Sequence, residues 1–347
     1  MNRKLRTSAA FPAISLSQHK PSARFDANLL VCPEHRAEGA LALAYISHPD
    51  CLRHEMGEHH PESPARLRAI NDRLSAAGIW DWLRHVEAPL APLRALQRAH
   101  HALYLAELNA AWPKQGYVHL DPDTYMNPYT LTAASRAAGA VLRAVDGVMA
   151  GEFQRAFCAV RPPGHHATRA EAMGFCFYNN AAIAVLHALD QHGLARVALV
   201  DFDVHHGNGS EDILANDERV LMVSTFQHPL YPASGAEPLG FNMVNVPLAP
   251  YTDGVALRGA VTRDWLPALE RFAPQMIVIS AGFDAHRDDD MSQLMWADAD
   301  YAWLTEQIVE VADRHCRGRI VSTLEGGYDL SSLARSVLAH LRVLGGY

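Results

Sequence analysis

The stretch Val197-Ala-Leu-Val-Asp-Phe-Asp-Val-His-His-Gly207 joins a short apolar run directly to two carboxylates and two imidazoles. A second stretch, Met276-Ile-Val-Ile-Ser-Ala-Gly-Phe-Asp284, also leads from an apolar, β-branched run to a carboxylate. Continuous apolar runs of this length are typical of strands in a parallel sheet that is covered on both faces. Because ligands bind beyond the carboxyl ends of such strands, the two stretches predict acidic side chains at one edge of the sheet.

The rest of the chain alternates strands and helices in the same way. Ser63 as an N-cap and Pro64 at the first helical position predict a helix that Gly78 ends. The further predicted strands are 41–46, 157–160, 196–202, 220–224, 276–280 and 320–324, and the further predicted helices are 131–149, 180–191, 255–272, 298–315 and 331–344. This alternation favours one doubly wound α/β domain over residues 41–347.

Composition narrows the class of protein. The 347 residues are 49% hydrophobic and carry a formal net charge of −8, which argues against a general nucleic-acid binder. No apolar stretch reaches the roughly 18 residues that a membrane span needs, so no membrane association is expected. The five cysteines are odd in number and form no Cys-x-x-Cys motif, which fits free thiols in a reducing, cytoplasmic location.

Residues 1–40 are predicted to be an extension outside the domain. Residues 1–25 contain Lys and Arg but no Asp or Glu, and they lack the apolar core of a secretory signal. A disordered segment is one interpretation, and an organelle transit peptide is the alternative.

The two strand ends together predict a metal centre. Asp201, Asp203 and His205 are spaced by two and project to one side in an extended backbone. Alone, this pattern also fits a histidine that is satisfied by a neighbouring carboxylate. Asp284 favours the metal, because two carboxylates that point into one crevice repel each other unless a cation holds them. Three protein ligands and an open position are typical of a catalytic ion, and Gly207 stands where a second metal would need a carboxylate.

Two further segments offer catalytic groups. His165 and His166 follow a stiff Pro-Pro-Gly turn and are candidates for general acid and base, the alternative being a surface pair. Tyr328 follows two glycines and could donate to a developing oxyanion, the alternative being an ordinary loop tyrosine. The remaining histidine pairs lack a place at a strand end and are interpreted as supporting or surface groups: His59-His60 and His100-His101.

Several of these segments resemble the zinc-dependent histone deacetylase superfamily. The likeness is to its class II branch, which includes bacterial histone deacetylase-like amidohydrolases and acetylpolyamine amidohydrolases. It covers the chain from about residue 40 to the end. The motifs, in order, are His60-Pro-Glu-Ser-Pro-Ala-Arg66, Arg161-Pro-Pro-Gly-His-His-Ala167, Gly174-Phe-Cys-Phe-Tyr-Asn-Asn180, Val200-Asp-Phe-Asp-Val-His-His-Gly-Asn-Gly209, Ser280-Ala-Gly-Phe-Asp284 and Leu324-Glu-Gly-Gly-Tyr-Asp329.

The resemblance implies an arginase/deacetylase-like α/β/α sandwich, with three layers around a mostly parallel sheet of about eight strands. It implies one catalytic Zn²⁺ held by Asp203, His205 and Asp284, although this ligand set would also accept Fe²⁺ or Co²⁺. It places the catalytic groups at His165, His166 and Tyr328. The other implied sites are orienting residues at Asp201 and Asn208, a substrate channel at Gly174, Phe175, Tyr231 and Met291, and a structural K⁺ or Na⁺ at Asp201, Asp203, His205 and Ser224.

The implied activity is hydrolysis of N-acetyl-lysine side chains or similar N-acylated amines by water that the metal activates. The partners would then be acetylated peptides, proteins or small amines, and a homo-oligomer stays open. An acetylpolyamine or other small-molecule amidohydrolase is the alternative, followed by a non-catalytic acetyl-lysine-binding scaffold. Polyamine-specific relatives place a Glu near Met291, and its absence here weakens the polyamine alternative. The run Asp288-Asp289-Asp290 is either an acidic rim that attracts cations or a solvated loop.

Overall fold

The computed structural model describes residues 43–347, so the predicted extension lies outside the described residues. An eight-stranded sheet runs in the order β2-β1-β5-β10-β9-β6-β7-β8. Every neighbouring pair in it is parallel. The strands are β1 (Leu43–Ser47), β2 (Arg84–Glu87), β5 (Arg155–Cys158), β6 (Val197–Asp201), β7 (Val220–Gln227), β8 (Met243–Leu248), β9 (Met276–Ala281) and β10 (Ile320–Leu324). The predicted parallel α/β sheet is confirmed.

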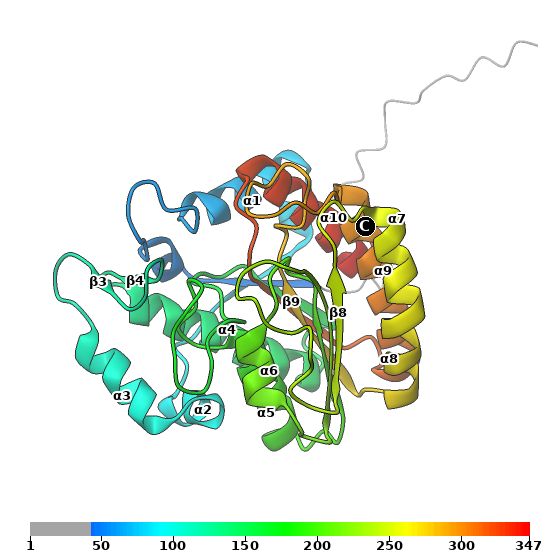
Figure 1. The fold of residues 1–347 in the computed structure, drawn as a ribbon, viewed down its shortest axis with the longest axis horizontal. Coiled ribbons are helices and arrows are strands. Elements are labelled where there is room, and N and C mark those ends of the chain that lie inside the picture. The colour runs from blue at the N-terminus through cyan, green and yellow to red at the C-terminus, as the bar shows by residue number, and fades with distance from the viewer. Residues whose placement is uncertain (1–42) are drawn as a thin grey trace, which may run out of the picture. The chain divides into compact units, whose positions relative to one another are not determined.

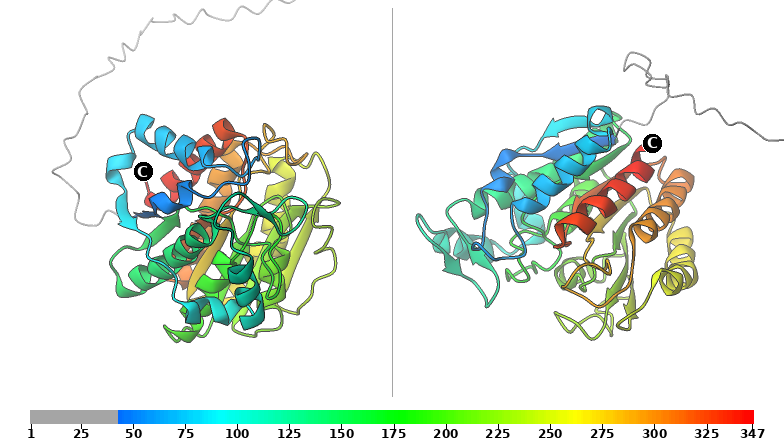
Figure 2. Two further views of the ribbon diagram at one scale, coloured as in Figure 1. Left: turned by 90° about the vertical axis from the view of Figure 1, so that its left-hand side faces the viewer. Right: turned by 90° about the horizontal axis from the view of Figure 1, so that it is seen from above.

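Helices cover both faces of this sheet. On one face α4 (Thr130–Ala150) and α5 (Asn180–Asp190) lie against the strands, and α5 also contacts α2 (Leu93–Ala99) and α6 (Asn208–Leu214). The other layer consists of α1 (Ala65–Ala76), α7 (Gly254–Ala260), α8 (Leu266–Phe272), α9 (Asp298–His315) and α10 (Leu330–Gly345). Figure 1 shows α7, α8 and α9 on one side of the strands and α4, α5 and α6 on the other, and Figure 2 gives two further views.

The strand order brings the polar segments together. β5, β10, β9 and β6 are consecutive neighbours in the middle of the sheet, although β5 and β10 lie far apart in the sequence. Every residue of these four strands is buried, which explains their continuous apolar runs. Each is followed by one of the predicted functional segments, so four loops meet at one sheet edge.

The structure contains elements that were not predicted: the helices α2, α3 (Ala102–Ala111) and α6, and elements at the sheet's margins. The edge strands β2 and β8 were not predicted, because β2 is largely exposed and β8 contains Pro247. The predicted helix 255–272 is continuous but passes through a π-helical turn at Val261–Trp265. Pro64, rather than Ser63, is the N-cap of α1, and no side chain bonds to that helix end. A small ribbon of β3 (Val118–His119) and β4 (Tyr125–Met126) follows α3 (Ala102–Ala111).

Membrane insertion gains no support from the helices. Among residues 43–347, none of the helices combines the length and the apolar character that crossing a bilayer requires.

Candidate active site

A narrow cavity of about 130 Å³ lies where the four central loops meet. Its lining contains members of three predicted groups: His166, His205 and Tyr328 from the catalytic and metal sets, and Gly174, Phe175, Tyr231 and Met291 from the channel set. Asp123 also lines it and was not predicted. The cavity has the concave shape and mixed polar lining of a substrate site.

The predicted metal ligands converge below this cavity. Nδ1 of His205 lies 3.0 Å from Oδ1 of Asp203 and 3.3 Å from Oδ2 of Asp284. All three residues are buried, although they come from the loops after β6 and β9. Two carboxylates and one imidazole are therefore held within reach of one ion.

This group fits a divalent cation. Oδ2 of Asp284 is buried and forms no hydrogen bond among the described residues, and Nδ1 of His205 at 3.3 Å is the ion-pair partner it shares with Asp203. Two buried carboxylates that share one imidazole favour an added cation. Burial alone would lower the pKa of His205, but the Asp203 and Asp284 carboxylates raise it to about 10. The site thus stabilises positive charge at Nδ1, where a proton and a metal ion would compete. Nitrogen and carboxylate donors suit Zn²⁺ and also Fe²⁺.

Gly326 leaves the space that this group needs. A Cβ at this position would lie 1.9 Å from Oδ2 of Asp284 and 2.6 Å from Oδ2 of Asp203. The Gly326 amide donates to Oδ2 of Asp203 at 2.8 Å and so orients that carboxylate. Any side chain here would displace both carboxylates.

The histidine pair is oriented from behind. Nδ1 of His165 lies 3.1 Å from Oδ2 of Asp201, and Nδ1 of His166 lies 2.7 Å from Oδ1 of Asn208. The two rings are adjacent, with centroids 4.1 Å apart, and His166 is the member that lines the cavity. Each ring therefore presents its Nε2 away from its orienting partner, which is the arrangement that directs an imidazole toward substrate.

The pKa values of His165 and His166 are shifted in opposite directions. Burial and then the charges of His165 and His205 hold the pKa of His166 well below its usual value. Burial would also lower the pKa of His165, but Asp203 and then Asp201 raise it to about 10. A cation beside Asp203 would offset that carboxylate and reduce this preference. His166 thus favours the neutral imidazole, the form that can accept a proton.

Tyr328 faces the same cavity from the loop after β10. Its ring meets Phe175 edge to face with centroids 5.9 Å apart, and the Arg66 guanidinium lies 4.9 Å from the ring centroid. Burial raises the pKa of Tyr328 well above its usual range, so the hydroxyl keeps its proton and remains a hydrogen-bond donor.

The channel walls are aromatic and closely packed. The Tyr231 and His166 ring centroids are 5.2 Å apart. A Cβ on Gly174 would lie 2.4 Å from Cδ2 of His166, so only glycine lets the backbone pass this close. Phe175 adopts φ = 68°, which is an unfavourable backbone conformation for a residue other than glycine. Such strained conformations are often found at functional sites. Behind it, the His60 and Phe175 ring centroids are 4.7 Å apart, which gives His60 a supporting place.

Comparison with known proteins decides the family. The family model described as "Histone deacetylase domain" matches residues 60–344. The chain belongs to the histone deacetylase family. It is 37% identical to the histone deacetylase-like amidohydrolase of Pseudomonas aeruginosa, over 85% of this chain and 84% of that protein. It is 34% identical to the chloroplastic histone deacetylase 14 of Arabidopsis thaliana, over 83% of this chain and 74% of that protein.

A solved structure supports the same assignment. The crystal structure of the HDA15 HD domain superposes with a TM-score of 0.83 at 33% identity, covering 88% of this chain and 90% of that one. The fold is therefore the arginase/deacetylase-like fold that the sequence motifs imply, and the family is one of deacetylases and amidohydrolases.

Three buried residues that hold segments next to this cavity were not predicted as a group. Arg161 donates to both carboxylate oxygens of Glu62, at 2.5 and 2.7 Å, and neither side chain is exposed. Arg66 donates to the Gly327 carbonyl at 2.6 Å and to the Glu325 carbonyl, so it fixes the loop that carries Tyr328. Both arginines lie inside motifs that the sequence displays, but burial of their charges is visible only in the fold.

Two carboxylates beside the site also escaped prediction. Oε2 of Glu325 accepts from the Gly164 and His165 amides at 2.7 and 3.0 Å, and burial raises its pKa to about 7. Oδ2 of Asp289 accepts from the Tyr328 and Asp329 amides at 2.6 and 3.0 Å. Asp289 is buried, so the run 288–290 is neither a free acidic rim nor a fully solvated loop.

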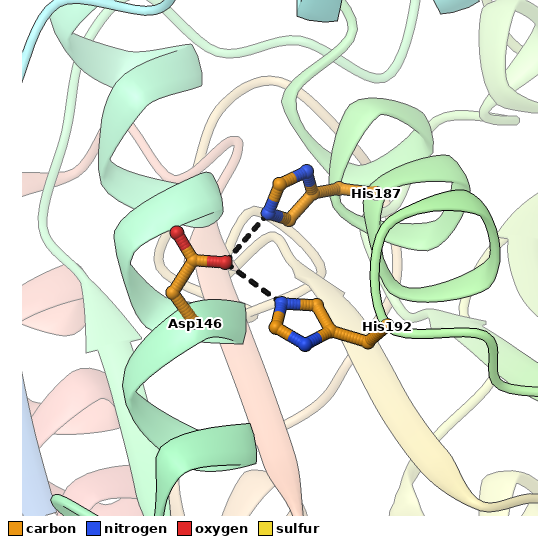
Figure 3. A group of neighbouring side chains, drawn as sticks. All are labelled: Asp146, His187 and His192. Atoms are coloured by element: carbon orange, nitrogen blue, oxygen red, sulfur yellow. Dashed lines mark hydrogen bonds and ion pairs between the residues drawn. The ribbon is translucent and has the colours of Figure 1, made fainter.

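The deacetylase domain contains a second group of Asp and His side chains, none of which lines this cavity. Asp146 of α4, His187 of α5 and His192 just after α5 offer three further ligand atoms within reach of one ion. Figure 3 shows both imidazoles pointing at one oxygen of Asp146; the Nε2 to Oδ1 distances are 2.7 and 2.8 Å. Arg98 donates to Nδ1 of His187 at 3.2 Å. Because a guanidinium only donates, the His187 proton lies on Nε2 and is given to Asp146.

The predicted monovalent-cation residues also lie close together. β6 and β7 pair Asp201 with Ser224, next to the loop that carries Asp203 and His205. The Ser224 hydroxyl donates to Oδ1 of Asn245 at 3.2 Å.

Proposed function

We propose that this protein is a zinc-dependent deacetylase that hydrolyses the acetyl group from N-acetyl-lysine side chains. The proposal rests chiefly on one observation: the buried carboxylates of Asp203 and Asp284 share the imidazole of His205 at the base of the cavity that His166 and Tyr328 line. Asp203, His205 and Asp284 would hold the ion. Family membership supports the same reaction class.

The residues around the ion define the proposed mechanism. Zn²⁺, when bound, would polarise an acyl oxygen and acidify a water molecule. His166, supported by His165, would take a proton as that water attacks the acetyl carbon. The Tyr328 hydroxyl would donate to the oxyanion of the tetrahedral intermediate. His166 would then return the proton to the leaving amine as the carbon–nitrogen bond breaks, giving acetate and free amine.

The hydrogen-bond partners of His165 and His166 account for the order of proton transfer. Asp201 and Asn208 hold the two rings by Nδ1, so that Nε2 is the nitrogen available for chemistry. An amide partner fixes the His166 ring without adding a charge that would raise its pKa. His166 would therefore start neutral and could accept the proton. Because its pKa is low, the protonated ring would readily give that proton to the leaving amine.

The channel favours acetyl-lysine over an acetylpolyamine. Phe175, Tyr231 and Met291 give the channel walls aromatic and thioether surfaces, which suit the methylene stem of lysine. A polyamine would place a secondary ammonium further out, and Met291 offers it no charge. Asp123 lines the cavity, where its carboxylate could accept from a peptide amide as well as from a polyamine ammonium, so it does not separate the two classes.

Turnover on two substrates tests this proposal. We expect kcat/KM for an acetyl-lysine peptide to exceed that for N-acetylspermidine, and we expect a chelator to abolish both activities until Zn²⁺ is restored. No hydrolysis of either substrate by the zinc-loaded protein would contradict the enzyme proposal and favour a binding scaffold. A preference for acetylspermidine would contradict the substrate assignment alone.

Two further expectations belong to this proposal. A structural K⁺ or Na⁺ would be held near Asp201, Asp203, His205 and Ser224, an arrangement that the register of β6 and β7 supports. A reducing, cytoplasmic location is supported by the free cysteines of the described residues, all of which are buried: Cys51, Cys158, Cys176 and Cys316.

A further inference from the structure

A second cavity, of about 560 Å³, lies beside the catalytic channel and has no part in the proposed chemistry. The two cavities share Tyr231 in their linings. Asp121 and Met173 line the larger one, whereas Asp123 and Gly174 line the channel. The same three short segments therefore contribute to both cavities and form the wall between them. Tyr231 is 39% exposed, so the residue that the two cavities share lies at the outer end of the channel, and the larger cavity lies next to the channel mouth.

The larger cavity combines acidic and apolar groups. Three carboxylates line it, from Glu107 of α3, Asp121 and Glu171, and its lining contains no Lys or Arg. Asp121 is already engaged, because its oxygens accept from the Asp123 amide and from Thr124. Among the described residues, Glu107 and Glu171 form no ion pair, so their charges remain available to a ligand.

Apolar side chains make up much of the remaining surface. Leu108, Leu120 and Met173 contribute to it, next to the two free carboxylates. A long side chain with a methylene stem and a cationic end matches this combination, because the stem can cover the apolar surface while the charge reaches the carboxylates. Lysine and arginine are the two residues with that form.

The position of the wall also constrains the ligand's shape. A molecule that fills the channel and the larger cavity at once must branch at the channel mouth, near Tyr231. A peptide branches there, because its backbone can lie across the mouth while two side chains enter different cavities. An acetylpolyamine is linear and has no second chain to place.

We propose that the larger cavity binds a Lys or Arg side chain that flanks the acetyl-lysine of a peptide substrate, with Glu107 and Glu171 as the charged contacts. This inference rests on the proposed deacetylase function and names its substrate class. Because ion pairs between exposed charges are individually weak, the two carboxylates together give about a threefold to tenfold preference for a basic flanking residue.

Peptide binding tests the assignment without depending on turnover. The probes are fluorescently labelled acetyl-lysine peptides in which the two residues on either side of the acetyl-lysine are varied. Each peptide carries one Arg at one of these four positions, and the reference peptide carries Gln at the same position. Fluorescence anisotropy on the zinc-loaded full chain gives the dissociation constants. We expect at least one Arg peptide to bind about threefold to tenfold more tightly than its Gln reference. The Glu107→Gln, Glu171→Gln double variant should lose this difference.

The control is Glu306→Gln, because Glu306 is an exposed residue of α9 outside both cavity linings. This variant should keep the preference, and all variants should bind a peptide with Gln at every flank equally well. An Arg preference that survives in the double variant, or its absence from the unmodified protein, would overturn the proposal. So would an equal loss of N-acetylspermidine affinity in the double variant, since that ligand is linear.

The two proposals can fail separately. Peptides that bind with the Arg preference but are not hydrolysed would support the cavity assignment and contradict the deacetylase proposal. Peptides that are hydrolysed at equal rates with Arg or Gln at every flank, and bind equally, would contradict the cavity assignment alone.

Discussion

Two groups of Asp and His side chains in the described part of the chain bring three ligand atoms together, and they differ in charge balance and in burial. Asp203, His205 and Asp284 set two carboxylates against one imidazole, and all three are buried. Asp146, His187 and His192 set one carboxylate against two imidazoles, and the Asp146 side chain is 52% exposed.

Convergence of ligand atoms alone therefore does not identify a metal centre. In the exposed group both imidazoles lie at hydrogen-bond distance from Asp146, and Arg98 fixes the tautomer of His187, so protons already satisfy the contacts. In the buried group two carboxylates share one imidazole, whose Nδ1 lies 3.0 Å from Oδ1 of Asp203 and 3.3 Å from Oδ2 of Asp284, and the latter oxygen forms no hydrogen bond with any residue that the structure describes. An excess of buried negative charge is the feature that calls for a cation.

The largest expected effect comes from removing one carboxylate from each group. Asp284→Asn should lower kcat/KM on an acetyl-lysine peptide by more than about 100-fold, because loss of a direct ligand should exceed the roughly 10–100-fold cost of losing an outer partner of a metal site. The matched change Asp146→Asn should alter it less than about twofold, because Asp146 belongs neither to the cavity lining nor to the buried ligand group. Steady-state kinetics on the two purified variants would check this, with circular dichroism to show that both fold. Equal losses in both variants would contradict the distinction between the groups.

A comparable loss of turnover, but without loss of the metal, should distinguish the oxyanion donor from the metal ligands. Tyr328→Phe removes the hydroxyl but leaves the ring against Phe175 and Arg66. Loss of one oxyanion donor typically lowers kcat by about 10²–10³-fold, and we expect that loss here with metal content and KM nearly unchanged. Turnover and metal analysis of the same preparation would measure it. Full turnover in Tyr328→Phe would remove this residue from the mechanism.

The smallest effect concerns the exposed group. Hydrogen bonds from His187 and then His192 lower the pKa of Asp146, so its carboxylate stabilises the fold at pH values above the unfolded pKa of about 3.9. This contribution is lost as the pH falls through the folded pKa. Because the group is exposed, Asp146→Asn should cost only about 0.2–1 kcal/mol at pH 7.

Urea unfolding of both proteins at pH 7, 5 and 3.5 would test this sign. The difference between wild type and Asp146→Asn should persist at pH 5 and shrink at pH 3.5. A difference that grows below pH 4 would mean that the carboxylate is not the stabilising form.

The sequence predicts the centre of this molecule better than its margins. The apolar runs of β6, β9 and β10 lead directly into Asp203, Asp284 and Tyr328, so fold and site share one local signal. The edge strand β2 carries no such signal, because its residues are mostly exposed. Its pairing with β1 depends on the assembled sheet rather than on its own composition.

The supporting groups were missed for a different reason. Glu62 and Asp289 act through buried contacts with Arg161 and with the Tyr328 amide, which come from distant parts of the chain. A lone Asp or Glu in a loop gives no sign of burial, since such residues are usually solvated. Only the three-dimensional arrangement identifies them as partners of the site.

Metal stoichiometry tests the central claim most directly. The full chain, its Asp284→Asn variant and a triple variant with Asp146→Asn, His187→Ala and His192→Ala would be dialysed against buffered Zn²⁺ and analysed by inductively coupled plasma mass spectrometry. We predict about one Zn²⁺ per chain for the wild type and the triple variant, and loss of bound Zn²⁺ in Asp284→Asn. Zinc that stays bound in Asp284→Asn but is lost from the triple variant would contradict the assignment of the buried group as the metal centre.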